Sequence, residues 1–355
     1  MRSTGSDLEK LRSFTLSAVA LGVVLAILVL GQSFLAPLAI AILFWQLLEA
    51  LVNELCHLRI GRFSPPRWFA TILVTALILL ILYVIGIVLL GQADAIANAW
   101  PRYAERMKSM IEGLADWLGQ GPTAKLREDL GKIDVMKPAA GVFTSVQSFM
   151  VSIGIVFLYV AFLFTERRYI SDKLAALLTD RKAARDTENL LAAISRNVRL
   201  YIRIKTLMGV LTGVLGYVVL RALSIDFAET WALLIFLLYY IPIVGWLLGV
   251  IFPALVAWVQ FDTITSCLGV IFGISAIWTV VSNFVEPLLM RKSLDLGAFA
   301  IVLSITFWGT IWGVVGMFLS VPIMVVTMIV CAHVPGWRWA SILLSKDGRV
   351  SDSSG

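Results

Sequence analysis

Residues 296–337 form a run of 42 positions without Asp, Glu, Lys or Arg. About 20 apolar residues cross a bilayer as a helix, so this run is too long for one ordinary crossing. Gly309, Gly313 and Gly316 fall near its centre, where a helix would lie deepest. Backbone polar groups cannot face lipid, so a helix interrupted at that depth must be lined by protein or by a water-filled cavity. Such interruptions are typical of transport sites, and they predict a membrane transporter rather than an enzyme.

The composition of the whole chain also indicates a membrane protein. It is 59% hydrophobic and 15% charged, whereas soluble domains average about 25% charged residues. Seven charge-free stretches hold most of the apolar residues: 13–48, 68–93, 138–165, 206–220, 230–261, 263–285 and 296–337. The first is long enough for two helices that turn near Gly31, and the shortest must borrow from its flanks to span the bilayer. The predicted fold is an all-α polytopic membrane protein with eight hydrophobic segments, two of them (230–261 and 296–337) interrupted.

The formal charge of +6 belongs to segments that flank the membrane. Segment 166–205 holds ten Lys or Arg against five Asp or Glu, whereas 94–137 holds seven of each. Cytoplasmic loops carry an excess of Lys and Arg, so both termini, 49–67 and 166–205 are predicted to be cytoplasmic and 94–137 to lie outside. A nucleic-acid partner would need a basic soluble face, and the sequence offers none.

These features predict four regions. Residues 1–93 form a three-helix membrane region, and 94–137 form an extracytoplasmic amphipathic helical hairpin, either a solvated cap or a gate. Residues 138–344 form the membrane transport region, which includes the cytoplasmic amphipathic segment 166–205. Residues 345–355 are a polar tail that is expected to be disordered.

The two interrupted segments resemble each other. Residues 230–261 contain Pro242, Gly245 and Gly249, and 296–337 contain the central glycines and Pro322. Proline removes an amide donor and glycine loosens a helix, so both segments are expected to break. Either both cross fully, or both are re-entrant hairpins. The charge rule favours hairpins, because they place Arg291 and Lys292 in the cytoplasm.

A polar cluster lies just before the last run. Ser282, Asn283, Glu286 and Pro287 are close in sequence, and Asn283 and Glu286 share a helix face because they are three residues apart. Pro287 leaves a carbonyl one turn back without its amide partner. Oxygen-rich groups beside open backbone suit a monovalent cation or a small polar solute. The competing interpretation is a helix-end carboxylate that rests among lipid headgroups.

Other polar and small residues allow two interpretations. Tyr239 and Tyr240 either line a cavity or belong to the usual aromatic belt at a membrane interface. The glycines of 296–337 have a small-xxx-small spacing, so close helix packing competes with a break exposed to solute.

Motifs of enzymes and of metal sites are missing from the sequence. It has no Gly-rich loop that ends in Lys-Ser/Thr and no His-Glu-x-x-His. Its three cysteines and two histidines are scattered, so neither a metal nor another cofactor is expected. The energy for transport must then come from an ion gradient, the membrane potential or the solute's own gradient.

The stretch Asn283-Phe-Val-Glu286-Pro287 and the Phe-Trp-Gly309, Gly313, Gly316 and Pro322 elements that follow it resemble the C-terminal signature of the autoinducer-2 exporter family of bacterial inner-membrane proteins. Ile241-Pro242-Ile-Val-Gly245 matches the other common motif of that family. The hydrophobic layout fits over almost the whole chain. Members usually have Gly where Arg291 stands, and often Pro or Ser near Gly297-Ala298, departures that could alter substrate or gating.

The resemblance implies a homo-oligomeric secondary transporter in the lipid bilayer, for which a pentamer is one candidate. Some family members are linked to export of autoinducer-2 and others to sodium or lithium/proton antiport, so both functions stay open, beside a non-transporting membrane scaffold. The positions that match the family motifs are Pro242, Gly245, Asn283, Glu286, Pro287, Gly309, Gly313, Gly316 and Pro322.

Overall fold

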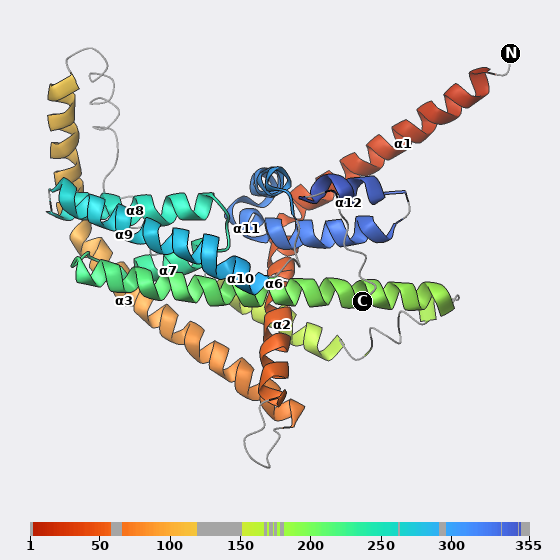
Figure 1. Cartoon of the computed structure of the whole chain (residues 1–355), viewed down its shortest axis with the longest axis horizontal. Coiled ribbons are helices and arrows are strands. Elements are labelled where there is room, and N and C mark those ends of the chain that lie inside the picture. The colour runs from red at the N-terminus through yellow and green to blue at the C-terminus, as the bar shows by residue number, and fades with distance from the viewer. Residues whose placement is uncertain are drawn as a thin grey trace. The chain divides into compact units, whose positions relative to one another are not determined.

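The computed structural model describes residues 3–57, 66–118, 151–166, 169, 173, 176–177, 181–261, 263–290, 296–334, 336–346 and 348 (Figure 1). In this part of the chain the regular elements are helices, and an isolated bridge pairs Leu296 with Ser345. Six of the described helices are long and apolar enough to cross a membrane, and three shorter apolar helices accompany them. The prediction of an all-α polytopic membrane protein is therefore confirmed.

The labelled helices are α1 (Ser3–Leu30), α2 (Gln32–His57), α3 (Arg67–Leu118), α6 (Arg181–Ala222), α7 (Ala228–Leu238), α8 (Val244–Phe261), α9 (Ile264–Val280), the π-helical turn η1 (Val281–Val285), α10 (Glu286–Met290), α11 (Ala298–His333) and α12 (Arg338–Leu344). A further apolar helix covers Val151–Glu166. Gly31 separates α1 from α2 at the predicted turn. Each of the eight predicted segments therefore corresponds to an apolar helix, with 230–261 divided between α7 and α8.

Two helices are longer than the segments that predict them. α3 has 52 residues, so apolar segment 68–93 and the amphipathic stripe that follows form one helix. α6 has 42 residues, so the short segment 206–220 gains its length from the basic residues before it, as expected. The second amphipathic stripe of 94–137, the loop with Arg291 and Lys292, and most of 345–355 lie outside the described residues.

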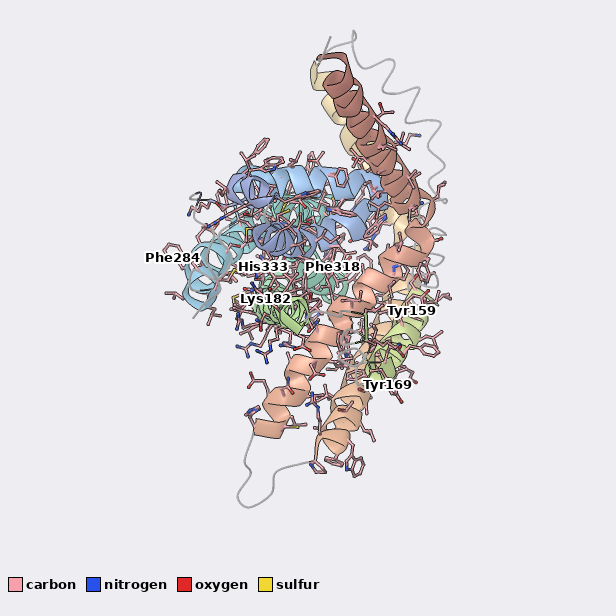
Figure 2. All side chains as sticks on the ribbon, turned by 90° about the vertical axis from the view of Figure 1, so that its right-hand side faces the viewer. Tyr159, Tyr169, Lys182, Phe284, Phe318 and His333 are labelled. Carbon is pink, nitrogen blue, oxygen red and sulfur yellow. The ribbon has the colours of Figure 1, made fainter. Side chains whose placement is uncertain are left out.

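Large apolar side chains project away from the ribbon over much of the surface (Figure 2). On α3 these include Leu77, Ile81 and Val84, and Phe284 of η1 is 65% exposed. A continuous apolar surface of this kind is unfavourable in water, and in a bilayer it is covered by lipid chains. The side-chain distribution thus agrees with the membrane placement.

The chain divides into two compact units, and the first comprises 1–45, 156–198 and 294–355. Within it, α11 is broken at Gly313, which has φ 61° and ψ −139°. The hydroxyl of Ser304 donates a hydrogen bond of 2.9 Å to the carbonyl oxygen of Ser320. In one straight helix these residues would lie about 24 Å apart along the axis, because each residue rises about 1.5 Å. α11 is therefore a helical hairpin whose arms pack against each other.

The second unit comprises 46–155 and 199–293, and glycines bring its helices together. A Cβ on Gly213 of α6 would lie 3.0 Å from the carbonyl oxygen of Ala232 and 3.2 Å from the Cβ of Phe236, both on α7. A Cβ on Gly273 of α9 would lie 2.8 Å from a methyl group of Val219 on α6. The missing side chains allow α7 and α9 to approach α6 closely, as small residues do between membrane helices.

Within this second unit, α7 and α8 also form a helical hairpin. The rings of Trp231 and Phe252 stack with centroids 6.3 Å apart. Near the other ends of the two helices, the backbone N–H of Asp226 donates to the side-chain oxygen of Gln260 at 2.8 Å. Pairs at such different sequence separations can form only when the two helices run antiparallel. The base of the hairpin is thus at 226 and 260, and its tip is at 239–243.

Candidate functional site

The tip of the α7–α8 hairpin is a tight turn. Pro242 lacks an amide hydrogen, and Ile243 has a φ of 64°, which is costly for a β-branched residue. The N–H of Gly245 donates to the carbonyl oxygen of Ile241 at 2.9 Å. A Cβ on Gly245 would lie 1.9 Å from the carbonyl oxygen of Leu238, so a side chain cannot fit there. This turn places Tyr239, a residue predicted for the site, at the end of the hairpin.

Tyr239 contacts Glu286, the carboxylate singled out by the sequence. Its hydroxyl donates a hydrogen bond of 2.6 Å to Oε2 of Glu286. The other carboxylate oxygen, Oε1, forms an ion pair with Nζ of Lys205 at 2.7 Å. Nζ also lies 4.9 Å from the centroid of the Tyr239 ring, within the range of a cation–π contact. Lys205, Tyr239 and Glu286 therefore form one polar cluster made by α6, the hairpin tip and α10.

A π-helical turn precedes Glu286. It covers Val281–Val285, and the N–H of Glu286 bonds to the carbonyl oxygen of Val281, five residues back. Pro287 follows directly and has no N–H for the regular α-helical ladder. Single π turns inside α-helices are frequent at functional sites. This one places Ser282 beside the hydroxyl of Tyr239 and turns Glu286 inward, whereas the side chain of Asn283 is exposed.

The charges of the cluster are nearly shielded from solvent. The side chains of Lys205 and Glu286 are each 12% exposed. A buried charge is tolerated only when it is paired and its hydrogen-bonding capacity is met. Here the carboxylate has one partner on each oxygen, and the ring of Trp278 covers Tyr239 with centroids 5.1 Å apart. The Glu286 carboxylate is thus held in an apolar setting. Neutralising its charge would break the ion pair with Lys205 and leave that ammonium group unpaired.

Sequence reasoning did not identify Lys205. It was assigned to the cytoplasmic segment 166–205, with the other basic residues that set topology. A signal was present, because the charge-free run 206–220 is too short for a span and must extend over its flanks. Lys205 is the first residue of that extension. It therefore lies where the helix enters the apolar region.

A second polar contact joins α6 to the hairpin tip. The hydroxyls of Thr206 and Tyr240 share a hydrogen bond of 2.5 Å. All five predicted binding residues therefore lie in the second unit, where Tyr239 contacts Glu286 and Asn283 is exposed.

The predicted break residues occupy different environments. Gly313 has the positive φ at the tip of α11, whereas a Cβ on Gly316 would lie 1.8 Å from the carbonyl oxygen of Trp308. A Cβ on Gly309 would lie 3.0 Å from the side chain of Met317. Gly249 and Pro322 are buried inside α8 and α11, and Gly249 lies against Trp278 and Ile235. In α11, one glycine therefore breaks the helix while its two neighbours allow the arms to pack.

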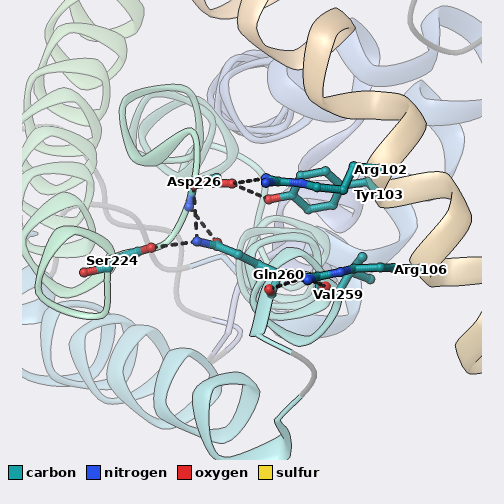
Figure 3. A network of polar contacts seen from close by, with 7 residues as sticks. All are labelled: Arg102, Tyr103, Arg106, Ser224, Asp226, Val259 and Gln260. Atoms are coloured by element: carbon teal, nitrogen blue, oxygen red, sulfur yellow. Dashed lines mark hydrogen bonds and ion pairs between the residues drawn. The ribbon is translucent and has the colours of Figure 1, made fainter.

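The base of the α7–α8 hairpin is attached to the amphipathic end of α3 (Figure 3). The hydroxyl of Tyr103 donates to Asp226 at 2.6 Å, and Arg102 lies 3.4 Å from the same carboxylate. Arg106 donates to the backbone carbonyl oxygens of Val259, at 3.2 Å, and Gln260. Burial and the Asp226 carboxylate raise the pKa of Tyr103 well above its usual range. These contacts hold both ends of the hairpin base to one helix.

Tyr103→Phe is expected to lower the free energy of unfolding by about 1.5 kcal/mol at neutral pH, because a partly buried hydrogen bond to a carboxylate is lost. A raised pKa in the folded state means that stability is lost as pH rises past about 10, where the unfolded chain releases the proton. The variant should lose part of this alkaline sensitivity. Chemical unfolding in detergent micelles at pH 7 and above pH 10 measures both effects. The control is Tyr83→Phe, because Tyr83 is an exposed tyrosine on the same helix. Equal alkaline loss in wild type and Tyr103→Phe would contradict the assignment.

In the described part of the chain, no three His, Cys, Asp or Glu side chains gather in a way that could hold a metal ion. The polar cluster offers instead a carboxylate, an ammonium group and hydroxyls. These groups can bind a proton, a small cation or a hydrogen-bonding solute.

Comparison with known proteins gives consistent matches over most of the chain. A family model described as AI-2E family transporter matches residues 16–336. The chain is 29% identical over 346 residues to the AI-2 transport protein TqsA of Escherichia coli, a match that covers 93% of this chain and 97% of that protein. It is 26% identical over 345 residues to a Haemophilus influenzae protein named as a transport protein, with 95% and 96% of the two chains covered.

Proposed function

Because this chain belongs to the AI-2E family of transporters, we propose that it is a secondary transporter that exports a small polar solute across the bacterial inner membrane. The name of TqsA refers to autoinducer-2, so this molecule is the first solute to test. In the proposed mechanism the two helical hairpins rearrange against the remaining helices. Interrupted helices at membrane depth are typical of solute sites in secondary transporters.

The observation that carries the proposal is the buried ion pair of Lys205 and Glu286 at the tip of the α7–α8 hairpin. Ionisable groups inside a membrane are costly and usually functional. A proton that binds Glu286 removes its charge and leaves Lys205 as an unpaired buried ammonium group. This cost favours a state in which the tip moves away and water reaches Lys205. Proton binding is thereby coupled to movement of the hairpin.

The length of the first arm of each hairpin supports a re-entrant arrangement. α7 has 11 residues and is about 17 Å long, roughly half of the ~30 Å hydrocarbon core. The first arm of α11, residues 298–312, is about 22 Å long by the same rise per residue. Arms of this length can enter and leave by one membrane face. In that topology Arg291, Lys292 and both termini are cytoplasmic, as the positive-inside rule favours.

A second candidate function is monovalent cation/proton antiport. It is favoured by the oxygen atoms at the tip, because the Glu286 carboxylate and the Tyr239 hydroxyl are ligands suited to a hard cation. A cation would have to displace Lys205 from the carboxylate. This requirement places antiport behind export of a polar solute. In both cases we propose a homo-oligomer, since the family resemblance implies one.

The test uses purified protein in liposomes with an imposed proton gradient. Labelled autoinducer-2 is expected to move in response to the gradient, and sodium should not dissipate it. Glu286→Gln should reduce gradient-driven flux by about 5- to 150-fold, the range of coupling free energies of about 1–3 kcal/mol. The control is Glu54→Gln, because Glu54 is an exposed carboxylate that pairs with Arg203 in the same unit.

Two outcomes would count against the proposal. If Glu286→Gln transports at the wild-type rate with the same pH dependence, Glu286 does not couple the proton gradient. If sodium or lithium dissipates the gradient while autoinducer-2 stays in place, the protein is a cation/proton antiporter.

A further inference from the structure

Tyr201 is a buried residue near the polar cluster of Lys205, Tyr239 and Glu286. It was not among the site residues predicted from the sequence. It lies on α6 one helical turn before Lys205, and 2% of its surface is exposed. Its hydroxyl has no hydrogen-bond partner in the described part of the chain. Residues four apart on a helix share one face, so Tyr201 lies on the face of α6 that carries Lys205, the partner of Glu286. Tyr201 therefore faces the polar cluster at the hairpin tip.

An unpaired buried hydroxyl is unusual. More than nine in ten buried polar groups in proteins have a partner, because an unmade hydrogen bond destabilises the folded state. The other hydroxyls of the cluster are occupied, since Tyr239 bonds to Glu286 and Tyr240 to Thr206. Tyr201 thus retains the capacity to donate and to accept a hydrogen bond at a site that is otherwise satisfied. Such a group is expected to bind something that is not part of the chain.

The local charge indicates what this partner is. The ammonium group of Lys205 neutralises the carboxylate of Glu286 at 2.7 Å, so the cluster carries no net charge. An added cation or anion would enter an apolar setting without a counter-charge, which is unfavourable. An uncharged oxygen, such as a hydroxyl or carbonyl oxygen, can pair with Tyr201 at no such cost. A solute and a trapped water molecule both offer this chemistry.

We propose that the hydroxyl of Tyr201 binds an uncharged, oxygen-bearing solute during transport. This inference rests on the proposed function, because it assigns a solute contact within the same site. Tyr201 then contributes to affinity and specificity, whereas the Lys205–Glu286 pair responds to the proton. The two roles separate experimentally, since removing one hydroxyl leaves the ion pair in place.

Tyr201→Phe removes the hydroxyl and keeps the ring. The matched control is Tyr217→Phe, on the same helix, whose hydroxyl donates to Glu229 at 3.3 Å. The probe is labelled autoinducer-2. The melting temperature of purified protein, with and without the probe, and the concentration dependence of its flux in liposomes are measured for wild type and both variants.

Without probe, Tyr201→Phe is expected to melt at the wild-type temperature or slightly above it, because a buried unpaired group is removed. The rise in melting temperature caused by the probe should be smaller than in wild type at the same probe concentration. The concentration for half-maximal flux should increase by about ten-fold, as for the loss of one hydrogen bond, while the maximal flux changes by less than about two-fold. Tyr217→Phe should keep the wild-type half-saturation concentration.

An unchanged half-saturation concentration in Tyr201→Phe would overturn the inference. If the melting temperature of that variant also falls, the hydroxyl is bridged to the protein by trapped water. A wild-type protein that binds autoinducer-2 through Tyr201 but does not move it would contradict only the proposed transport. A wild-type protein that neither binds nor moves the probe would contradict both.

Discussion

Replacing Lys205 with methionine is expected to lower the free energy of unfolding by about 3–5 kcal/mol, because Glu286 becomes a buried carboxylate without its cation. Each side chain is 12% exposed, so water cannot take the place of the missing partner. The double variant Lys205→Met/Glu286→Gln should recover most of this loss, since neither charge is then left unpaired. Both variants should lose proton-driven flux, because the proposed coupling needs the pair.

Chemical unfolding in detergent micelles gives the stability of each variant. The control is Arg203→Met, because Arg203, on the same helix as Lys205, forms an exposed pair with Glu54 of α2, and such pairs contribute only about 0–1 kcal/mol. Equal destabilisation by the single and the double substitution would show that the lost interaction is not the ion pair. In that case the loss would come from removing the ammonium group itself rather than from leaving the Glu286 carboxylate unpaired.

Gly316→Ala is expected to destabilise the α11 hairpin by more than about 4 kcal/mol, among the largest effects of single substitutions. The added Cβ would lie 1.8 Å from the carbonyl oxygen of Trp308 and 2.5 Å from its carbonyl carbon. Both atoms belong to the backbone and cannot move aside as a flexible side chain does. The arms of the hairpin would have to separate. The yield of monodisperse protein from membranes and its melting temperature measure the loss.

Two other glycines provide a graded comparison. Gly313→Ala meets no described atom within 4 Å but must adopt a φ of 61°, so the loss should be about 1–3 kcal/mol. Gly91→Ala on α3 also meets no described atom within 4 Å, and it should stabilise the helix by about 1 kcal/mol at most. Should Gly316→Ala behave like Gly91→Ala, the two arms of α11 do not approach as closely as the structure places them.

Much of the candidate site could be predicted from local features of the sequence. Glu286 follows a charge-free run and precedes a proline, and Tyr239 and Ser282 each adjoin an interruption of an apolar segment. Hydropathy, charge and helix-breaking residues are properties of short stretches of chain. The residues that they identified on three separate helical elements meet in one cluster.

The separate roles of the glycines in 296–337 could not be predicted from local sequence features. Gly309, Gly313 and Gly316 are the same residue in one repeating pattern, which allowed either a break or close packing. The structure assigns the break to Gly313 and the close approach to the other two. Backbone conformation and neighbouring atoms decide between these roles, and the residue type alone determines neither of them.

The sequence by itself determined the fold class, the apolar segments and the two interruptions, because a membrane imposes helix length and hydrophobicity on each segment separately. Only the tertiary structure decided that Lys205 pairs with Glu286 at the tip of the α7–α8 hairpin, and that Tyr201 is buried one helical turn before Lys205. Pairing between distant helices depends on which faces and which missing side chains allow them to approach. That information is distributed over α6, α7 and α9, and it appears when these helices pack together.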